Sequence, residues 1–481
     1  MKFYKDKEFV RHITRLAVPI ALQNLLTSVV NIVDQVMVGA LPAEIANYAM
    51  SAVLLVNQIV FIFQIVIFAI CNTNNVFISQ YWGKNDRDAI PPAVGFGLCL
   101  SIAIALLTTL VCMLFPHFVV GLFAPKAEIL RYAEEFLRVV ALSFLPSTIS
   151  IVLTFALRGL KQMKLALIAN GAAIVVNCFL NFSLMFGKFG FPEMGLVGAA
   201  WGTAFSRIVE MAIVLVGLLI AKYPITARLP KMVAWSKDYL KKFSKMFLPI
   251  LSNEVFWVLG ASIYLAVFAQ LPDSENVLAA VNVTQSVDKL VGVAMIGLGS
   301  ATSVVIGNIL GMNDVEKAKA YAKMSVQYSL VVGILIAAVM FALSFCVQFF
   351  FVNLNAESLA YARNLMMIFA VAAIVRTLTF NLMIGVLRAG GDTTFCFITE
   401  TCTVWLIAVP ICCLTGLLFQ WRVEIIYSLI YVEEALKSLI LYLRQRSGKW
   451  IRVLVGKDTP AVEQAAAQGI EAESEQESDP S

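Results

Sequence analysis

The chain has 481 residues, of which 60% are hydrophobic and only 14% are charged. Soluble proteins have about a quarter of their residues charged, so this composition excludes an ordinary soluble domain. The formal net charge of +5 is explained by the location of the basic residues, described below, so we expect no nucleic-acid partner. Apolar runs of about 18 residues or more recur along nearly the whole length, which predicts a polytopic membrane protein.

Twelve membrane-spanning helices are expected from these runs, so the predicted fold class is an all-α integral membrane protein. The first run is too long for the apolar core of a signal peptide, and we expect it to be retained. The predicted ranges are 14–39, 47–79, 91–116, 128–156, 163–187, 195–222, 243–270, 276–307, 319–352, 357–386, 393–418 and 422–445.

The distribution of Lys and Arg predicts the orientation of these spans. With this layout, 26 of the 36 basic residues fall on the side that holds both termini, and 5 fall on the other side. Loops rich in Lys and Arg remain in the cytoplasm. We therefore expect a multi-pass protein of the cell inner (plasma) membrane with both termini cytoplasmic.

Three short motifs recur in the same order at an offset of about 230 residues, which indicates a duplication. The matched segments are 16–20 with 246–250, 82–86 with 310–314, and 157–159 with 387–389. Six spans in each half give the two halves the same orientation, so a pseudo-twofold axis along the membrane normal should relate them. Duplicated membrane chains are typical of transporters, in which the substrate binds between the halves.

The expected organisation has five parts. They are a cytoplasmic N-terminal segment at 1–15, an N-lobe at 16–222, a cytoplasmic linker at 223–245, a C-lobe at 246–446, and a cytoplasmic, mostly disordered tail at 447–481. The nine cysteines lie almost entirely in apolar runs, and no pair has the spacing of a metal-finger site.

Eight motifs in order carry a resemblance to a known family. They include Pro19 with 23–24, 31–39, 78–83, Asn177 and Asn181 before 186–200, Pro249 with 253–254 and Trp257, 307–311, 385–393 and 447–450. Over about residues 12–455 the chain resembles the multidrug and toxic compound extrusion (MATE) family. The resemblance implies two six-helix lobes that form a V, alternating access, and export of organic cations against inward Na⁺ or H⁺. No cofactor is expected apart from that coupling ion.

Glu254 is the first candidate for cation coupling, supported by the neighbouring polar residue Asn253. It follows Pro249 by about one helical turn, and a carboxylate within a span must be protonated, ion-bound or paired. Proline removes a backbone hydrogen bond and frees carbonyl groups, which are suitable ligands for Na⁺. The resemblance also implies a coupling glutamate at this motif. The alternative is a structural hydrogen bond to a neighbouring helix.

Asp34 is the second candidate for cation coupling. It lies toward the external end of the first span, and the resemblance implies a coupling aspartate there. Asn31 is three residues earlier, and Asn177 or Asn181 could face Asp34 from the fifth span. Together these side chains would form an oxygen-rich pocket that could bind Na⁺. The alternative is a solvated carboxylate near the interface.

Asp288 is the third candidate, midway along the eighth span beside Lys289. Neighbours on a helix point about 100° apart, so these two cannot pair directly. Asp288 could face a cavity while Lys289 pairs with Glu254 or Glu400, or the two could form structural interhelix pairs. The tenth span offers Arg376 and no acid, which departs from a fully typical sodium site of the family.

Other charged residues within or at the ends of the spans are interpreted as structural. Arg207 and Glu210 are three residues apart on the sixth span and should pair. Glu433 and Lys437 are four apart on the twelfth span, with Glu434 beside them, and should also pair. Two arginines that end the fourth and tenth spans are expected to satisfy terminal carbonyls, namely Arg158 and Arg388.

Aromatic and Met side chains could line an adaptable substrate cavity for flat cations. In membrane spans such residues more often face lipid or neighbouring helices. The candidates are Met37, Phe61, Trp257, Tyr264 and Met295.

The leading hypothesis is a secondary antiporter that exports drugs or metabolites and functions as a monomer in the lipid bilayer. A lipid-linked saccharide flippase of the same superfamily is the main alternative, although a cavity for its anionic headgroup should be cationic. A polytopic membrane enzyme is less consistent with the sequence, which has only two histidines and no nucleotide-binding P-loop. A passive channel is disfavoured because the two halves carry unevenly placed acids.

Overall fold

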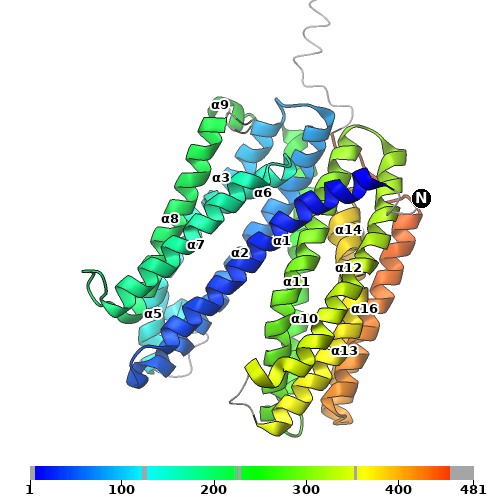
Figure 1. The fold of residues 1–481 in the computed structure, drawn as a ribbon. Helices are drawn as coiled ribbons and strands as arrows, with labels where there is room; N and C mark the ends of the chain where they lie inside the picture. Colours follow the sequence, from blue (N-terminus) through cyan, green and yellow to red (C-terminus); the bar gives the residue numbers. More distant parts are fainter. Residues whose placement is uncertain are drawn as a thin grey trace, which may run out of the picture.

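The computed structural model describes residues 6–121, 127–221, 223, 225, 229–350 and 355–455. These residues form two helical bundles, the N-lobe and the C-lobe, and contain no β-strand. The lobes lie close together at one end and diverge toward the other, so the molecule has the shape of a V (Figure 1). The C-terminal tail beyond Val455, which the sequence predicts to be disordered, lies outside the described residues.

The N-lobe contains six spans when its one broken helix is counted once. Its helices are α1 (Lys7–Gly39), α2 (Ala43–Lys84), α3 (Ile90–Leu114), α4 (Pro116–Gly121), α5 (Ala127–Ala141), α6 (Phe144–Gly159), α7 (Met163–Phe186) and α8 (Gly195–Ala221). The predicted fourth span is divided into α5 and α6, which are bent by 50°. Pro146 accounts for the break, because it has no N–H to donate to the carbonyl four residues earlier and its ring would collide with that carbonyl.

The linker and the C-lobe complete the helical structure. The linker contains α9 (Leu229–Met232) and also the first turns of α10, so the seventh span begins earlier than the sequence predicted. The C-lobe helices are α10 (Lys237–Phe268), α11 (Ser274–Gly311), α12 (Val315–Phe350), α13 (Ala356–Phe380) continued by η2 (Asn381–Leu387), then α14 (Thr393–Thr403), η3 (Val404–Ala408), α15 (Val409–Cys413), η4 (Leu414–Leu418) and α16 (Val423–Arg446).

Ten helices of the described chain are long and apolar enough to cross a membrane, and the α5–α6 pair makes eleven. The twelfth predicted span is α16, which fails this test of length and composition. It carries Glu433, Glu434 and Lys437 within its length. It nevertheless packs against α13 and α14, inside the C-lobe. The fold is therefore the all-α, twelve-helix membrane architecture that the sequence predicts.

Each lobe receives the beginning of one helix from the other lobe. Phe9, Ile13 and Leu16 of α1 belong to a buried cluster made mainly of C-lobe side chains. In the same way, Tyr239 and Phe243 of α10 belong to a buried cluster made mainly of N-lobe side chains. This reciprocal exchange is what a pseudo-twofold relation between the repeats requires, because α1 and α10 begin the two halves.

The repeated Gly83 and Gly311 permit the closest contact between the lobes. A Cβ on Gly83 would collide with the Asn308 carbonyl, and one on Gly311 would collide with the Gln80 carbonyl. These glycines do not themselves form the turns that follow the two helices. Both lie within helices, and the left-handed turn residues are Asn85 and Asn313, with φ values of 62° and 59°.

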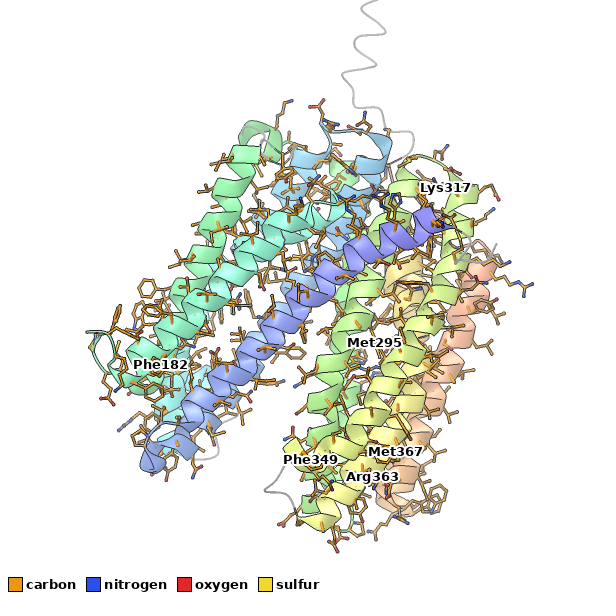
Figure 2. The ribbon with its side chains drawn as sticks, viewed as in Figure 1. Phe182, Met295, Lys317, Phe349, Arg363 and Met367 are labelled. Carbon is orange, nitrogen blue, oxygen red and sulfur yellow. The ribbon has the colours of Figure 1, made fainter. Side chains whose placement is uncertain are left out.

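Further interlobe contacts lie at the end of the molecule where the two lobes meet. Both ends of the described chain also lie there (Figure 1). The Gln80 side chain donates to the carbonyl of Ala389 at 3.2 Å and accepts from the backbone N–H of Leu454 at 2.9 Å. Lys317 lies at this end, whereas Phe349 lies at the opposite end of the C-lobe (Figure 2). We call the end where the lobes meet the terminal end. The V is closed at the terminal end and open at the other.

Candidate functional site

A polar cavity of about 150 Å³ lies inside the N-lobe. Side chains from α1, α2, α5, α6, α7 and α8 form its wall. Most helices of this lobe therefore contribute to one site. Its principal polar residues are Asn31, Asp34, Asn57, Gln64, Asn170, Asn177, Asn181, Thr203 and Arg207.

Asp34 is the centre of a hydrogen-bonded row within this cavity. Asn181 Nδ2 donates to Asp34 Oδ1 at 2.7 Å and contacts Asn177 Oδ1 at 3.4 Å. Asn177 Nδ2 in turn donates to Thr203 Oγ1 at 3.4 Å. The row joins α1, α7 and α8, so the structure brings together Asp34, Asn31 and the two asparagines that the sequence suggested as partners.

The charge balance of the cavity leaves Asp34 uncompensated. Asp34 is the only carboxylate among the described lining residues, and Arg207 is the only cation. Arg207 Nη1, however, lies 2.8 Å from Glu210 Oε2, so its charge is already paired. This pair is the one that the sequence predicts. When Asp34 is ionised, the cavity with its immediate surroundings consequently carries one net negative charge.

The oxygen atoms around Asp34 suit a hard cation. Asn181 Oδ1 is buried and has no hydrogen-bond partner within the described part of the chain. A Cβ on Gly202 would collide with that atom, so glycine on α8 is what allows Asn181 to occupy its position. Carboxylate, amide and hydroxyl oxygens are the ligands that hard cations prefer. A proton could instead bind the Asp34 carboxylate directly.

Asn57 and Gln64 of α2 also line the cavity, and the sequence reasoning missed them. They are seven residues apart, so they lie on the same face of α2. Two amides with that spacing in the largely apolar first part of this span are the sequence signal that could have identified them.

Glu254 lies outside this cavity and has a cation as its partner. Arg388 Nη1 is 3.0 Å from Glu254 Oε1, and the Arg388 side chain is only 4% exposed. The prediction that Arg388 serves terminal carbonyls is therefore wrong, because it pairs with the carboxylate 134 positions away. Neighbouring Asn253 is buried, and its Oδ1 has no partner among the described residues. Pairing, rather than a free ion-binding carboxylate, is the state of Glu254 in this structure.

Asp288 is also paired. Arg376 Nη1 of α13 lies 2.8 Å from Asp288 Oδ2. Lys289 is exposed, and the suggestion that it pairs with Glu254 or Glu400 is wrong, since those two carboxylates contact Arg388 and Lys437 respectively. The three acids predicted for cation coupling thus lie in three separate places, and only Asp34 lacks a basic partner in the described structure.

The predicted substrate-contact residues do not line the N-lobe cavity. Met295 is buried in the main C-lobe core, midway along α11 (Figure 2), and Tyr264 packs against the same core. Met37 packs against the core of the N-lobe. Phe61 and Trp257 are exposed. A drug-binding role for these five side chains stays a prediction, but it would have to involve a surface other than this cavity.

Comparison with known proteins assigns the fold to a family. The MatE family model matches residues 19–183 and again residues 249–414, which together are more than half of the chain. The chain belongs to the MatE family. The two matches begin 230 residues apart, which is the offset of the repeated motifs and confirms the duplication.

Curated relatives of this MatE protein are transporters. It is 26% identical over 352 residues to a probable multidrug resistance protein NorM of Haemophilus ducreyi, covering 70% of this chain and 71% of the relative. It is 23% identical over 419 residues to an uncharacterized transporter, YisQ, of Bacillus subtilis, covering 85% and 89%. Membership of a multidrug efflux family indicates a membrane transporter that acts on small molecules.

Solved structures share the fold of this MatE protein. A transporter of the MOP superfamily from Pyrococcus furiosus has a TM-score of 0.82 at 16% identity, covering 93% of this chain and 97% of that one. A multidrug resistance MATE family transporter in an outward-facing conformation also has a TM-score of 0.82, at 17% identity, covering 91% and 95%. At these identities the likeness establishes the architecture alone.

Proposed function

We propose that this MatE protein is a secondary antiporter that exports organic cations, including drugs or metabolites, in exchange for inward Na⁺ or H⁺. The observation that supports this proposal is the Asp34 cavity. It offers an uncompensated carboxylate in a polar chamber of the N-lobe, where a buried negative charge requires a cation or a proton as a partner.

The transporter operates by alternating access in the plasma membrane, with both termini in the cytoplasm. The terminal end of the V carries most of the basic loops, and positive loops remain in the cytoplasm. The closed end therefore faces the cytoplasm and the open end faces outward. In this outward-open state the N-lobe cavity releases its substrate and receives the coupling ion.

The size of the cavity limits what Asp34 binds directly. Drug-sized ligands occupy pockets of about 300–1,000 Å³, whereas this cavity measures about 150 Å³. It suits a partly hydrated ion, a proton, or the cationic group of a larger molecule whose body extends toward the space between the lobes. Arrival of Na⁺ or H⁺ at Asp34 removes the charge that attracts the organic cation, so the two ligands compete for the site and binding of one favours release of the other.

The alternative of a lipid-linked saccharide flippase is less well supported by the cavity. An anionic headgroup would need cationic partners, and Arg207, the only described cation of the lining, is occupied by Glu210. The net negative charge around Asp34 would repel a pyrophosphate.

Transport by reconstituted protein tests the proposal. Proteoliposomes loaded with a fluorescent organic cation should release it when an inward Na⁺ or H⁺ gradient is imposed, and Asp34→Asn should abolish this response. A Ser51→Ala variant is the matched control, because Ser51 does not line the cavity and its hydroxyl donates to its own helix backbone at Asn47. Release that is independent of both gradients in the wild-type protein would contradict antiport.

A further inference from the structure

Four charged side chains form a buried cluster in the C-lobe, away from Asp34. Lys437 Nζ of α16 lies 3.1 Å from Glu400 Oε1, 3.1 Å from Glu433 Oε1 and 2.9 Å from Glu434 Oε2. The sequence predicts the pairing within α16, and the structure adds Glu400 from α14. The side chains of Lys437, Glu400 and Glu433 are only 4 to 5% exposed.

The charges of this cluster do not balance. If all four groups are ionised, three carboxylates face one ammonium, which leaves an excess of two negative charges. A buried charge without a partner is costly, so protein interiors neutralise it or pair it. The excess must therefore be compensated by something other than Lys437.

The surrounding helices do not supply the missing positive charge. Arg376 on α13 interacts with Glu434, but it is already paired with Asp288 of α11. Arg388, which interacts with Glu400 from the end of η2, is already paired with Glu254 of α10. The other titratable groups of the described residues that interact with the cluster or with these arginines are uncharged when protonated and add no positive charge, namely Tyr264, Tyr427, Tyr431 and Cys396.

One buried oxygen of the cluster lacks a hydrogen bond. Lys437 Nζ donates to Glu400 Oε1 and Glu434 Oε2. Its contact with Glu433 Oε1 does not have hydrogen-bond geometry, so that oxygen has no hydrogen-bond partner in the described structure. Glu433 is 96% buried, being 4% exposed. An acceptor oxygen that is left without a donor in this position is where an added proton would be bound.

The position of the ammonium group favours a proton over a metal ion. Lys437 Nζ occupies the point that contacts all three carboxylates, which is the point that a metal ion would need. A second cation would be repelled from it and would have to displace the lysine. A proton needs no such space, because it attaches to a carboxylate oxygen that is already present.

We propose that Glu400, Glu433, Glu434 and Lys437 form a proton-binding site of the C-lobe, separate from the Asp34 cavity. Glu434 is the most accessible member, with 15% of its side chain exposed, and it connects the site to the half-buried Arg376–Asp288 pair. The role of this site in ion coupling rests on the proposed antiport, whereas the binding of protons does not.

Infrared spectroscopy of the purified protein tests the site without measuring transport. The wild-type protein should absorb at the frequency of buried, protonated carboxyl groups at neutral pH, and this band should decrease at alkaline pH. Two excess charges require about two protons, so in an Asp34→Asn background, which removes the cavity carboxyl group, Glu433→Gln should remove about half of the band. Glu316→Gln is the control, because that side chain is 85% exposed and should leave the band unchanged.

Three results distinguish failure of the proton-binding site from failure of the proposed antiport. A band that is unaffected by Glu400→Gln, Glu433→Gln and Glu434→Gln would overturn the proposal. So would the loss, when Na⁺ is added to an Asp34→Asn protein at constant pH, of the part of the band that depends on these glutamates. The three single variants guard against one that does not fold, and thermal unfolding identifies such a variant. If the wild-type protein shows the band but exchanges no organic cation, the proposed function fails while the proton site stands.

Discussion

The contact between Gly202 and Asn181 gives a way to perturb the cation site without changing any of its polar groups. Gly202 lies on α8, and a Cβ at this position would collide with Asn181 Oδ1 and lie 2.9 Å from the Asn181 backbone nitrogen. Gly202→Ala must therefore push Asn181 away from its position. Since Asn181 donates the 2.7 Å hydrogen bond to Asp34, we expect that bond to break.

The size of the effect follows from the competing terms. Replacing Gly by Ala within a helix stabilises it by about 0.5–1 kcal/mol, but overpacking costs about 1–3 kcal/mol. A hydrogen bond to a charged group contributes about 1.5–3 kcal/mol. The displacement also removes Asn181 Oδ1, an oxygen offered to the cation, from the site. Loss of one such contact with a charged group should weaken cation binding roughly tenfold to hundredfold. The free energy of unfolding should fall by the overpacking cost of about 1–3 kcal/mol, partly offset by the helix gain.

Gly171→Ala is the matched control for this prediction. Gly171 lies on α7, the helix that carries Asn181, and a Cβ there meets nothing within 4 Å. Equilibrium dialysis of radiolabelled tetramethylammonium, an organic cation compact enough for the cavity of about 150 Å³, against the two purified variants measures the difference. Equal affinities in correctly folded Gly202→Ala and Gly171→Ala proteins would refute the reasoning that Asn181 organises the site.

Three further changes test other contacts. Glu254→Gln leaves the buried Arg388 charge without its carboxylate. This change should lower the free energy of unfolding by about 3–5 kcal/mol. A double variant that also carries Arg388→Met should recover part of that loss. Gln80→Ala removes two hydrogen bonds between the lobes of about 1 kcal/mol each, which should favour opening of the terminal end in spin-label distance measurements. The pKa of Lys161 is lowered by burial and secondarily by Lys317 of the other lobe. The closed terminal end therefore favours the deprotonated Lys161 amine. Cross-linking between the lobes at this end should increase as the pH rises, and Lys161→Gln should remove this pH dependence.

The contrary outcomes are equally specific. Unchanged thermal unfolding of Glu254→Gln would mean that its ion pair with Arg388 contributes nothing. If the spin-label distances across the terminal end are the same in Gln80→Ala and Ser51→Ala, the Gln80 hydrogen bonds do not hold that end closed. A pH-dependent cross-linking rate that persists in Lys161→Gln would assign the titration to another group.

The sequence predicted the architecture well because local and repeated features determine it. Apolar runs define the spans, the charge bias predicts their direction, and the motif at Pro19 and Pro249 marks the start of both halves. The exchange of α1 and α10 between lobes agrees with that repeat. The break between α5 and α6 was missed, since its cause, Pro146, lies inside an otherwise continuous apolar run.

The sequence predicted the site less completely because its contacts join distant positions. Asp34 and its asparagines were recognised as possible partners, and the structure places them together. The pairing of Glu254 with Arg388 was not foreseen, because only tertiary packing brings residues 134 positions apart into contact. The lack of a cationic partner for Asp34 also depends on tertiary structure. Arg207 lines the same cavity, but its charge is paired with Glu210.

The central claim is that Asp34 binds an organic cation and the coupling ion in turn. Competition binding tests it most directly, by measuring radiolabelled tetramethylammonium, a compact organic cation, bound to the purified protein while Na⁺ or proton concentration is raised. The account predicts that one of these ions displaces the organic cation from the wild-type protein and that Asp34→Asn removes the displacement. Displacement that is as strong in a folded Asp34→Asn protein as in the wild type would contradict the account.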